Sequence, residues 1–165
     1  MATLEDLAYD RLFNRLSECS AAILSAHPPS GKAYDAELIR IPAKQRHAGR
    51  YHIDVIFILG RFLFLCELKG SSSESADDVS KLRDLTKDYT LDQLVSFISK
   101  RVNRTDIDWP SITEMVKVIG VVMHDCPMPG DFATLVAIAP GTFEVIVGND
   151  VDSAGDVRSI LATVF

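Results

Sequence analysis

The feature that most constrains this chain is residues 51–70, which read YHIDVIFILGRFLFLCELKG and are almost continuously apolar. Gly60 and Arg61 break the run, and glycine is what the first central position of a type II′ hairpin turn requires. We therefore predict a β-hairpin in which Leu59 pairs with Phe62. Both faces of that hairpin are apolar, so it should lie in the middle of a sheet that is covered on both sides.

The charged residues of the predicted hairpin gather at the end away from its turn. Counting back from the turn places Asp54 directly opposite Glu67, with Cβ atoms about 5 Å apart, and Lys69 on the same face. Opposed carboxylates destabilise a strand pair, and buried carboxylates without a partner are costly. A positive charge must therefore lie between them. Lys69 alone would make a structural ion network, whereas a divalent cation would make a metal site, which the directly opposed acids favour.

Composition sets the broad class. The 165 residues are 47% apolar and 24% charged, which is typical of one globular domain spanning 1–165. No apolar run is long enough for a membrane span, and the first ten residues do not resemble a secretory signal. The three cysteines lack C-x-x-C spacing, so they indicate neither disulfides nor a zinc site. We expect a cytoplasmic protein without membrane association. The net charge of −6 argues against bulk coating of nucleic acid but permits a local basic groove.

The spacing of apolar residues predicts the remaining elements. Thr90 and Gln93 have the spacing of a capping box, which would divide the second helical segment in two. The order of helices and strands is typical of an α/β domain with a central mixed β-sheet flanked by helices. The predicted elements are a helix at 4–24, a strand at 35–42, the hairpin, a loop at 71–75, helical sequence at 76–103, strands at 115–123, 133–139 and 142–148, and a helix at 153–163.

One set of residues resembles the motif of the PD-(D/E)xK nuclease superfamily: Asp54, with Glu67, Leu68 and Lys69 on the next strand. This superfamily includes many restriction endonucleases and the Holliday-junction resolvases. The resemblance covers about residues 4–123, where the order of elements is similar to the αβββαβ core of that family. The later strands would be C-terminal additions. Ile53 stands where the family motif has proline, a position that varies among members.

The resemblance implies a metal-dependent nuclease, an endonuclease in many relatives, that hydrolyses phosphodiester bonds of nucleic acid, with DNA favoured over RNA. Asp54, Glu67 and the backbone carbonyl of Leu68 would bind Mg²⁺ or Mn²⁺, which prefer oxygen ligands. The metal would activate a water molecule, and Lys69 would orient that water or stabilise the transition state. Relatives often carry a further metal-binding glutamate on the first helix. Glu5 has a suitable place there, although it equally suits the first turn through the helix dipole.

Further residues take on possible roles from the same resemblance. Some branches of the superfamily carry Gln-x-x-x-Tyr after the catalytic strands, and this chain has Gln93 followed by Phe97, so Gln93 is a candidate catalytic residue. Its place in a capping box explains it equally well. The basic residues Lys44, Arg46 and Arg50 precede the hairpin and could contact the backbone of nucleic acid, or simply form a solvated loop.

Two functional hypotheses follow from these residues. The first is the metal-dependent nuclease. The second is a non-catalytic module on the same fold, which binds nucleic acid or protein and uses the charged cluster only for structure. Because many relatives cut two strands with two copies, we also expect that a homodimer can form, although no interface pattern is evident in the sequence.

Overall fold

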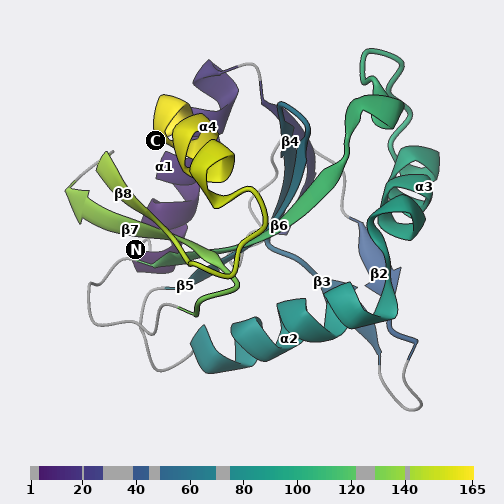
Figure 1. Ribbon diagram of the computed structural model, residues 1–165, viewed down its shortest axis with the longest axis horizontal. Coiled ribbons are helices and arrows are strands. Elements are labelled where there is room, and N and C mark those ends of the chain that lie inside the picture. Colours follow the sequence, from purple (N-terminus) through teal and green to yellow (C-terminus); the bar gives the residue numbers. More distant parts are fainter. Residues whose placement is uncertain are drawn as a thin grey trace.

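The computed structural model describes residues 4–19, 21–27, 39–44, 49–69, 75–121, 129–139 and 142–165, except for the side chains of 4–9, 69, 75, 121 and 139. Helices lie on both sides of a central sheet (Figure 1). The elements are α1 (Leu4–Glu18), β1 (Ala22–Ala26), β2 (Arg40–Pro42), β3 (Arg50–His52), β4 (Val55–Leu59), β5 (Phe62–Lys69), α2 (Ser75–Asp88), α3 (Leu91–Arg101), the 3₁₀ turn η2 (Trp109–Ser111), β6 (Glu114–Val121), β7 (Ala133–Ala139), β8 (Thr142–Val147) and α4 (Ala154–Val164).

The central sheet has six strands in the order β1-β4-β5-β6-β7-β8. β6 runs parallel to both β5 and β7, and the other neighbours are antiparallel. β2 and β3 form a separate two-stranded ribbon. The prediction of an α/β domain with a mixed sheet is thus confirmed. Within the described ranges, no helix is long and apolar enough to cross a membrane.

The predicted hairpin is present as β4 and β5 with the predicted register. Leu59 pairs with Phe62, and Val55 pairs with Cys66. A type II′ turn requires a positive φ at its first central residue and not at its second. Gly60 has a φ of 60°, and Arg61 does not have a positive φ. The positive φ is the reason that glycine suits this position. A Cβ atom there would lie 2.5 Å from Cδ1 of Ile160, the end of a side chain that can move.

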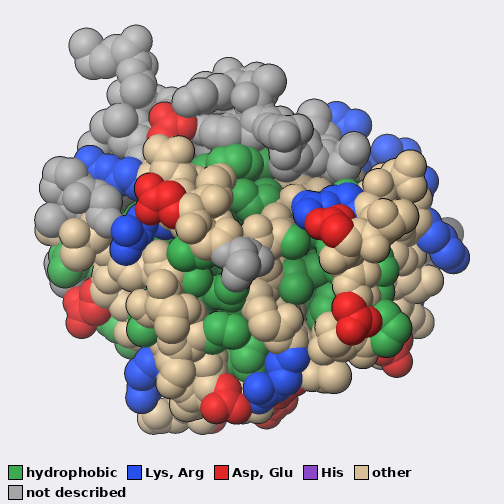
Figure 2. Space-filling model, turned by 90° about the horizontal axis from the view of Figure 1, so that it is seen from above, with side chains coloured by type: hydrophobic (Ala, Val, Ile, Leu, Met, Phe, Trp, Pro, Cys, Tyr) green, Lys and Arg blue, Asp and Glu red, His purple; other side chains and the backbone are tan. Residues whose placement is uncertain are grey.

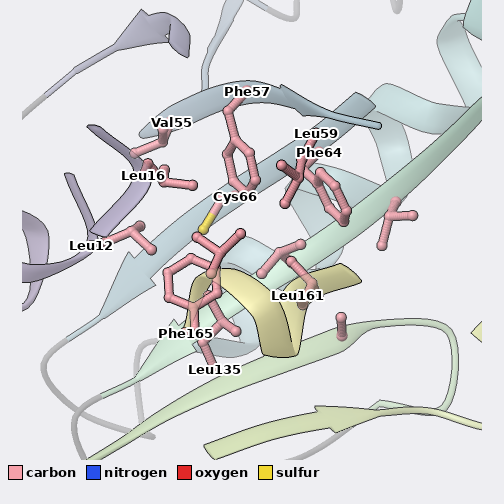
Figure 3. Close-up of a cluster of buried hydrophobic side chains, with 14 of the residues drawn as sticks. Leu12, Leu16, Val55, Phe57, Leu59, Phe64, Cys66, Leu135, Leu161 and Phe165 are labelled. Carbon is pink, nitrogen blue, oxygen red and sulfur yellow. The ribbon is translucent and has the colours of Figure 1, made fainter. Parts of the chain in front are cut away.

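The two apolar faces of the hairpin enter two separate cores. On one face, α1 and α4 cover Phe57, Phe64 and Cys66 (Figure 3). On the other face, α2 and α3 cover Ile56 and Leu65. The residues that these helices contribute are Leu12 and Leu16 from α1, Leu161 from α4, Leu82 and Leu85 from α2, and Leu94 and Ile98 from α3.

One prediction about the start of the chain is wrong, and a second is confirmed in part. The first helix ends at Glu18 rather than residue 24, and residues 22–26 form β1, antiparallel to β4. Backbone pairing with an otherwise open edge of β4 outweighs the helical spacing there. The described end of the strand predicted at 35–42 forms β2 (Arg40–Pro42), which pairs with β3 and not with the central sheet. Residues 35–38, 71–74 and 122–123 lie outside the described part of the chain.

The division of residues 76–103 into two helices is confirmed. α2 ends at Asp88 and α3 begins at Leu91. The Thr90 side chain accepts a hydrogen bond from the Gln93 backbone, and the Gln93 side chain accepts one from the Thr90 backbone. Both bonds of the capping box are therefore made.

An ion cluster around Asp131 joins α2 to the sheet and should make stability depend on pH. Asp131 lies 2.6 Å from Arg83 of α2 and 2.7 Å from Lys117 of β6, and hydrogen bonds from Arg83 and then Lys117 lower the pKa of Asp131. A carboxylate with a lowered pKa adds stability above its unfolded pKa of about 4, and that stability is lost as pH falls through the folded value. We therefore expect the free energy of unfolding to fall below about pH 4, and to fall less steeply in Asp131→Asn. Urea titrations at several pH values measure both slopes, and equal slopes would contradict the prediction.

Candidate functional site

The structure brings Asp54 and Glu67 together at the end of the hairpin away from its turn. Asp54 lies in a bend just before β4, and its Oδ2 accepts a 2.8 Å hydrogen bond from the backbone N–H of Leu68. Its backbone carbonyl accepts another, also 2.8 Å, from His27. The Glu67 side chain is 1% exposed and makes a side-chain hydrogen bond with Asp54. The backbone of two adjacent strands therefore holds the two carboxyl groups in contact.

The bend at Asp54 changes one detail of the predicted faces. In a regular strand, Ile53 and Val55 would lie on the same face. Instead, Ile53 packs into the core beneath α2 and α3, whereas Val55 packs beneath α1 and α4. Strand alternation begins only at Val55, so the bend moves Ile53 to the other side. The same bend turns the Asp54 carboxylate toward β5, where it reaches Leu68.

The acid pair is electrostatically costly. Burial is the main cause that raises the pKa of Glu67 well above its usual range, and the neighbouring charge of Asp54 raises it further. Lys81 acts in the opposite direction. Two carboxyl groups in contact at a buried position are stable when they share a proton or when a cation neutralises them.

Lys81 of α2 is the cation that sequence reasoning missed. Its Nζ lies 2.5 Å from Oε1 of Glu67, donates a 3.0 Å hydrogen bond to the carbonyl of His52, and lies 4.0 Å from Oδ1 of Asp78. The contact between Lys81 and Glu67 is an ion pair between a partly exposed ammonium group and a buried carboxylate. One signal was available: Asp78 lies at i and i+4 spacing with Leu82 on the apolar stripe of α2, where a carboxylate is unusual.

Cationic side chains surround His52, which lies two residues before Asp54. Its ring centroid is 5.5 Å from that of His27, whose Nε2 lies 2.8 Å from the Ile39 carbonyl. The pKa of His52 is lowered, first by burial and then by the positive charges of His27, Arg40, Lys81 and Arg50. The acid pair thus lies at the edge of a positively charged region.

The side chains of two predicted site residues lie outside the described part of the chain. Lys69 is the last residue of β5 and pairs with Val121, but only its backbone is described. Glu5 lies in the first turn of α1, a helix whose Leu12 packs on the face of the sheet opposite to the Glu67 side chain. Their proposed roles stay predictions, as does that of the Leu68 carbonyl.

The remaining predicted residues are distributed over a wider surface. Gln93 acts in the capping box at the start of α3, where its Oε1 also accepts a 3.4 Å hydrogen bond from Lys44. This junction lies at the opposite end of α2 from Asp78. Arg46 lies outside the described residues. Arg50 is exposed on β3.

The donor atoms of the acid pair are all oxygen, which suits Mg²⁺ or Mn²⁺ rather than softer metals. Within the described residues, no group of three or more His, Cys, Asp or Glu side chains is arranged to hold a metal ion. Asp54 and Glu67 would supply two ligands to such an ion, and further ligands would have to come from backbone carbonyls, water or undescribed side chains. Mg²⁺ commonly keeps several waters and takes only one or two carboxylates, so a pair is compatible with it.

Comparison with known proteins gives no independent assignment. No family model, no curated protein and no solved structure matches this chain. The function is therefore inferred from the chemistry of the Asp54, Glu67 and Lys81 cluster and from the surface beside it.

Proposed function

We propose that the protein is a divalent-metal-dependent nuclease that hydrolyses phosphodiester bonds, with DNA favoured over RNA. The observation that carries the proposal is the contact between the Asp54 and Glu67 carboxyl groups at the buried end of a hairpin. Such a pair favours a multivalent cation, and its oxygen atoms suit Mg²⁺ or Mn²⁺. The order α1, β1, β4, β5, α2, β6 agrees with the αβββαβ core of the PD-(D/E)xK superfamily and supports the same proposal.

In this proposal Asp54, Glu67 and the Leu68 carbonyl would hold the ion. When bound, the metal supplies a Lewis acid that activates water and neutralises charge on the phosphate. Lys81 contributes an ammonium group close to the acid pair. Such a group can stabilise negative charge that develops on the substrate. Lys69 keeps the role predicted from its place in the motif.

The β2–β3 ribbon supports a nucleic acid as the substrate. Ile41 and Tyr51 are buried, whereas Arg40, Arg50 and His52 are exposed, and Arg40 lies across from His52. Among the described residues, neither arginine forms an ion pair with a carboxylate. By contrast, acidic and basic side chains are interspersed on the described part of the face shown in Figure 2. The ribbon thus presents positive charge beside Asp54, as contacts to a phosphate backbone require.

Replacing both exposed arginines of the ribbon should weaken binding to nucleic acid. We expect Arg40→Ala/Arg50→Ala to lose roughly tenfold in affinity for a labelled DNA duplex in EDTA, and the slope of log affinity against log salt to fall by about one to two. Fluorescence anisotropy in EDTA measures binding without cleavage. Arg158→Ala, an exposed arginine of α4, is the matched control and should bind as the wild type does. Unchanged binding by the double variant would contradict the role of the ribbon.

The proposed activity is tested by incubating the protein with supercoiled plasmid, single-stranded DNA and RNA in Mg²⁺, Mn²⁺ or EDTA. We expect cleavage of DNA in either metal and no cleavage in EDTA, because the acid pair alone has no means to activate water. Cleavage that persists in EDTA would contradict the metal-dependent mechanism. The absence of cleavage in every metal would contradict the nuclease itself.

A non-catalytic module is the second candidate, and one observation favours it. Lys81 already lies 2.5 Å from Glu67, so the acid pair has a counter-ion without any metal. In that case the cluster is structural, and the basic ribbon binds nucleic acid or an acidic protein surface without cleaving it. DNA binding in EDTA together with no Mn²⁺ binding and no cleavage would select this candidate.

A further inference from the structure

Lys81 approaches the acid pair as a bound cation would. Oxygen atoms of three residues lie around its Nζ: Glu67 Oε1 at 2.5 Å, the His52 carbonyl at 3.0 Å and Asp78 Oδ1 at 4.0 Å. An ammonium group and a hard divalent cation both bind through oxygen lone pairs. Lys81 and a metal ion at Glu67 would therefore compete for the same carboxylate.

The two partners of this ion pair differ in how freely they can move. The Glu67 side chain is 1% exposed and extends from a central strand. The Lys81 side chain is 30% exposed and reaches the site on a flexible stem from α2. The Lys81 side chain can thus move away from Glu67 without disturbing the core. The buried Glu67 side chain is fixed in its place on the strand.

Asp78 provides a second place for the ammonium group. It lies one turn before Lys81 on α2 and is itself buried. If the Lys81 ammonium group leaves Glu67, it can remain beside Asp78. The exchange therefore does not leave this ammonium group without a carboxylate partner in a partly buried place. The ammonium group of Lys81 thus has two carboxylates within 4.0 Å, as an exchange between two positions needs.

We propose that Lys81 is an exchangeable counter-ion of the acid pair, an inference that rests on the proposed metal site. In the metal-free protein Lys81 neutralises Glu67. When Mg²⁺ or Mn²⁺ binds, the ammonium group moves away from Glu67, toward Asp78 and solvent. There it becomes available to a phosphate group of the substrate. The position of the Lys81 side chain therefore depends on whether the metal is bound.

Lysine acylation tests the exchange in the full chain. Wild-type protein is treated with an amine-reactive acetylating reagent with and without saturating Mn²⁺, and the modified lysines are located by mass spectrometry. We expect Mn²⁺ to raise the reactivity of Lys81 about fivefold, the change in free population when a partly exposed ion pair is released. Lys87, an exposed lysine on the same helix, is the internal control and should not change.

Two variants separate the exchange from the metal site itself. Glu67→Gln should make Lys81 reactive in both conditions, because its partner is lost. Asp54→Asn should lose Mn²⁺ binding but keep the Lys81 ion pair, so Lys81 stays protected throughout and the test does not depend on Glu67→Gln folding. Calorimetric titration with Mn²⁺ measures binding by each protein.

Each result decides the matter. If wild type binds Mn²⁺ and Lys81 reactivity does not rise, the exchange is overturned and the nuclease proposal stands. If wild type binds no Mn²⁺, the proposed metal site fails and the exchange fails with it. If reactivity rises equally at Lys81 and Lys87, the change is a general effect of the metal and the exchange is also overturned.

Discussion

Glu67→Gln is expected to abolish metal-dependent DNA cleavage, lowering the rate by at least about 10³-fold. The substitution keeps the size of the buried side chain and removes the negative charge that would hold the ion. Because burial already raises the pKa of Glu67, a neutral amide in its place should leave the fold intact. Plasmid cleavage rates in Mg²⁺, together with a thermal unfolding curve of each protein, measure the two effects separately.

Glu144→Gln is the matched control for that substitution. Glu144 is an exposed glutamate on β8, at the far edge of the sheet from β1, so the same change of charge should leave cleavage unaltered. Wild-type cleavage rates in a folded Glu67→Gln protein would remove Glu67 from the mechanism. Equal losses in both variants would indicate that overall charge, and not the site, controls the activity.

Phe64→Ala is expected to destabilise the protein by about 3–5 kcal/mol. Phe64 is fully buried on β5 and stacks on Phe57 of β4 with ring centroids 4.8 Å apart. Removing the ring leaves a cavity between the central hairpin and helices α1 and α4, which cannot close it without moving the strands. Urea unfolding monitored by circular dichroism measures the change in free energy.

Ile138→Ala provides the comparison for the core substitution. Ile138 lies on β7 and is 50% exposed, so its truncation should cost less than about 1 kcal/mol. A similar cost at both positions would mean that the hairpin does not occupy the centre of the core. Because β4 and β5 also support Asp54 and Glu67, a partly unfolded Phe64→Ala protein should lose cleavage as it loses structure.

The hairpin could be predicted from sequence because its determinants are local. A glycine at the first turn position fixes the pairing of Leu59 with Phe62, and every later pair follows from it. The contact between Asp54 and Glu67 follows from the same count, although Asp54 lies in a bend rather than in the strand. Local chemistry also sufficed for the capping box that begins α3.

The parts that sequence reasoning missed depend on contacts between distant segments. Residues 22–26 form β1 because β4 offers an edge to pair with, which helical spacing cannot reveal. Lys81 reaches Glu67 only because α2 packs across β5, and nothing in the spacing of the two residues indicates it. The basic ribbon likewise arises because β2 pairs with β3, which places Arg40 across from His52. The segment between these two strands includes residues 45–48, which lie outside the described part of the chain.

The most direct test of a metal at the acid pair is an anomalous difference map from crystals soaked in Mn²⁺. We expect a peak within about 2.5 Å of oxygen atoms from both Asp54 and Glu67, as hard-cation coordination requires. In the structure refined from the same crystals, the Lys81 ammonium group should no longer contact Glu67. A map with no Mn²⁺ peak at these carboxylates, at a Mn²⁺ concentration that supports cleavage, would contradict the proposed metal site.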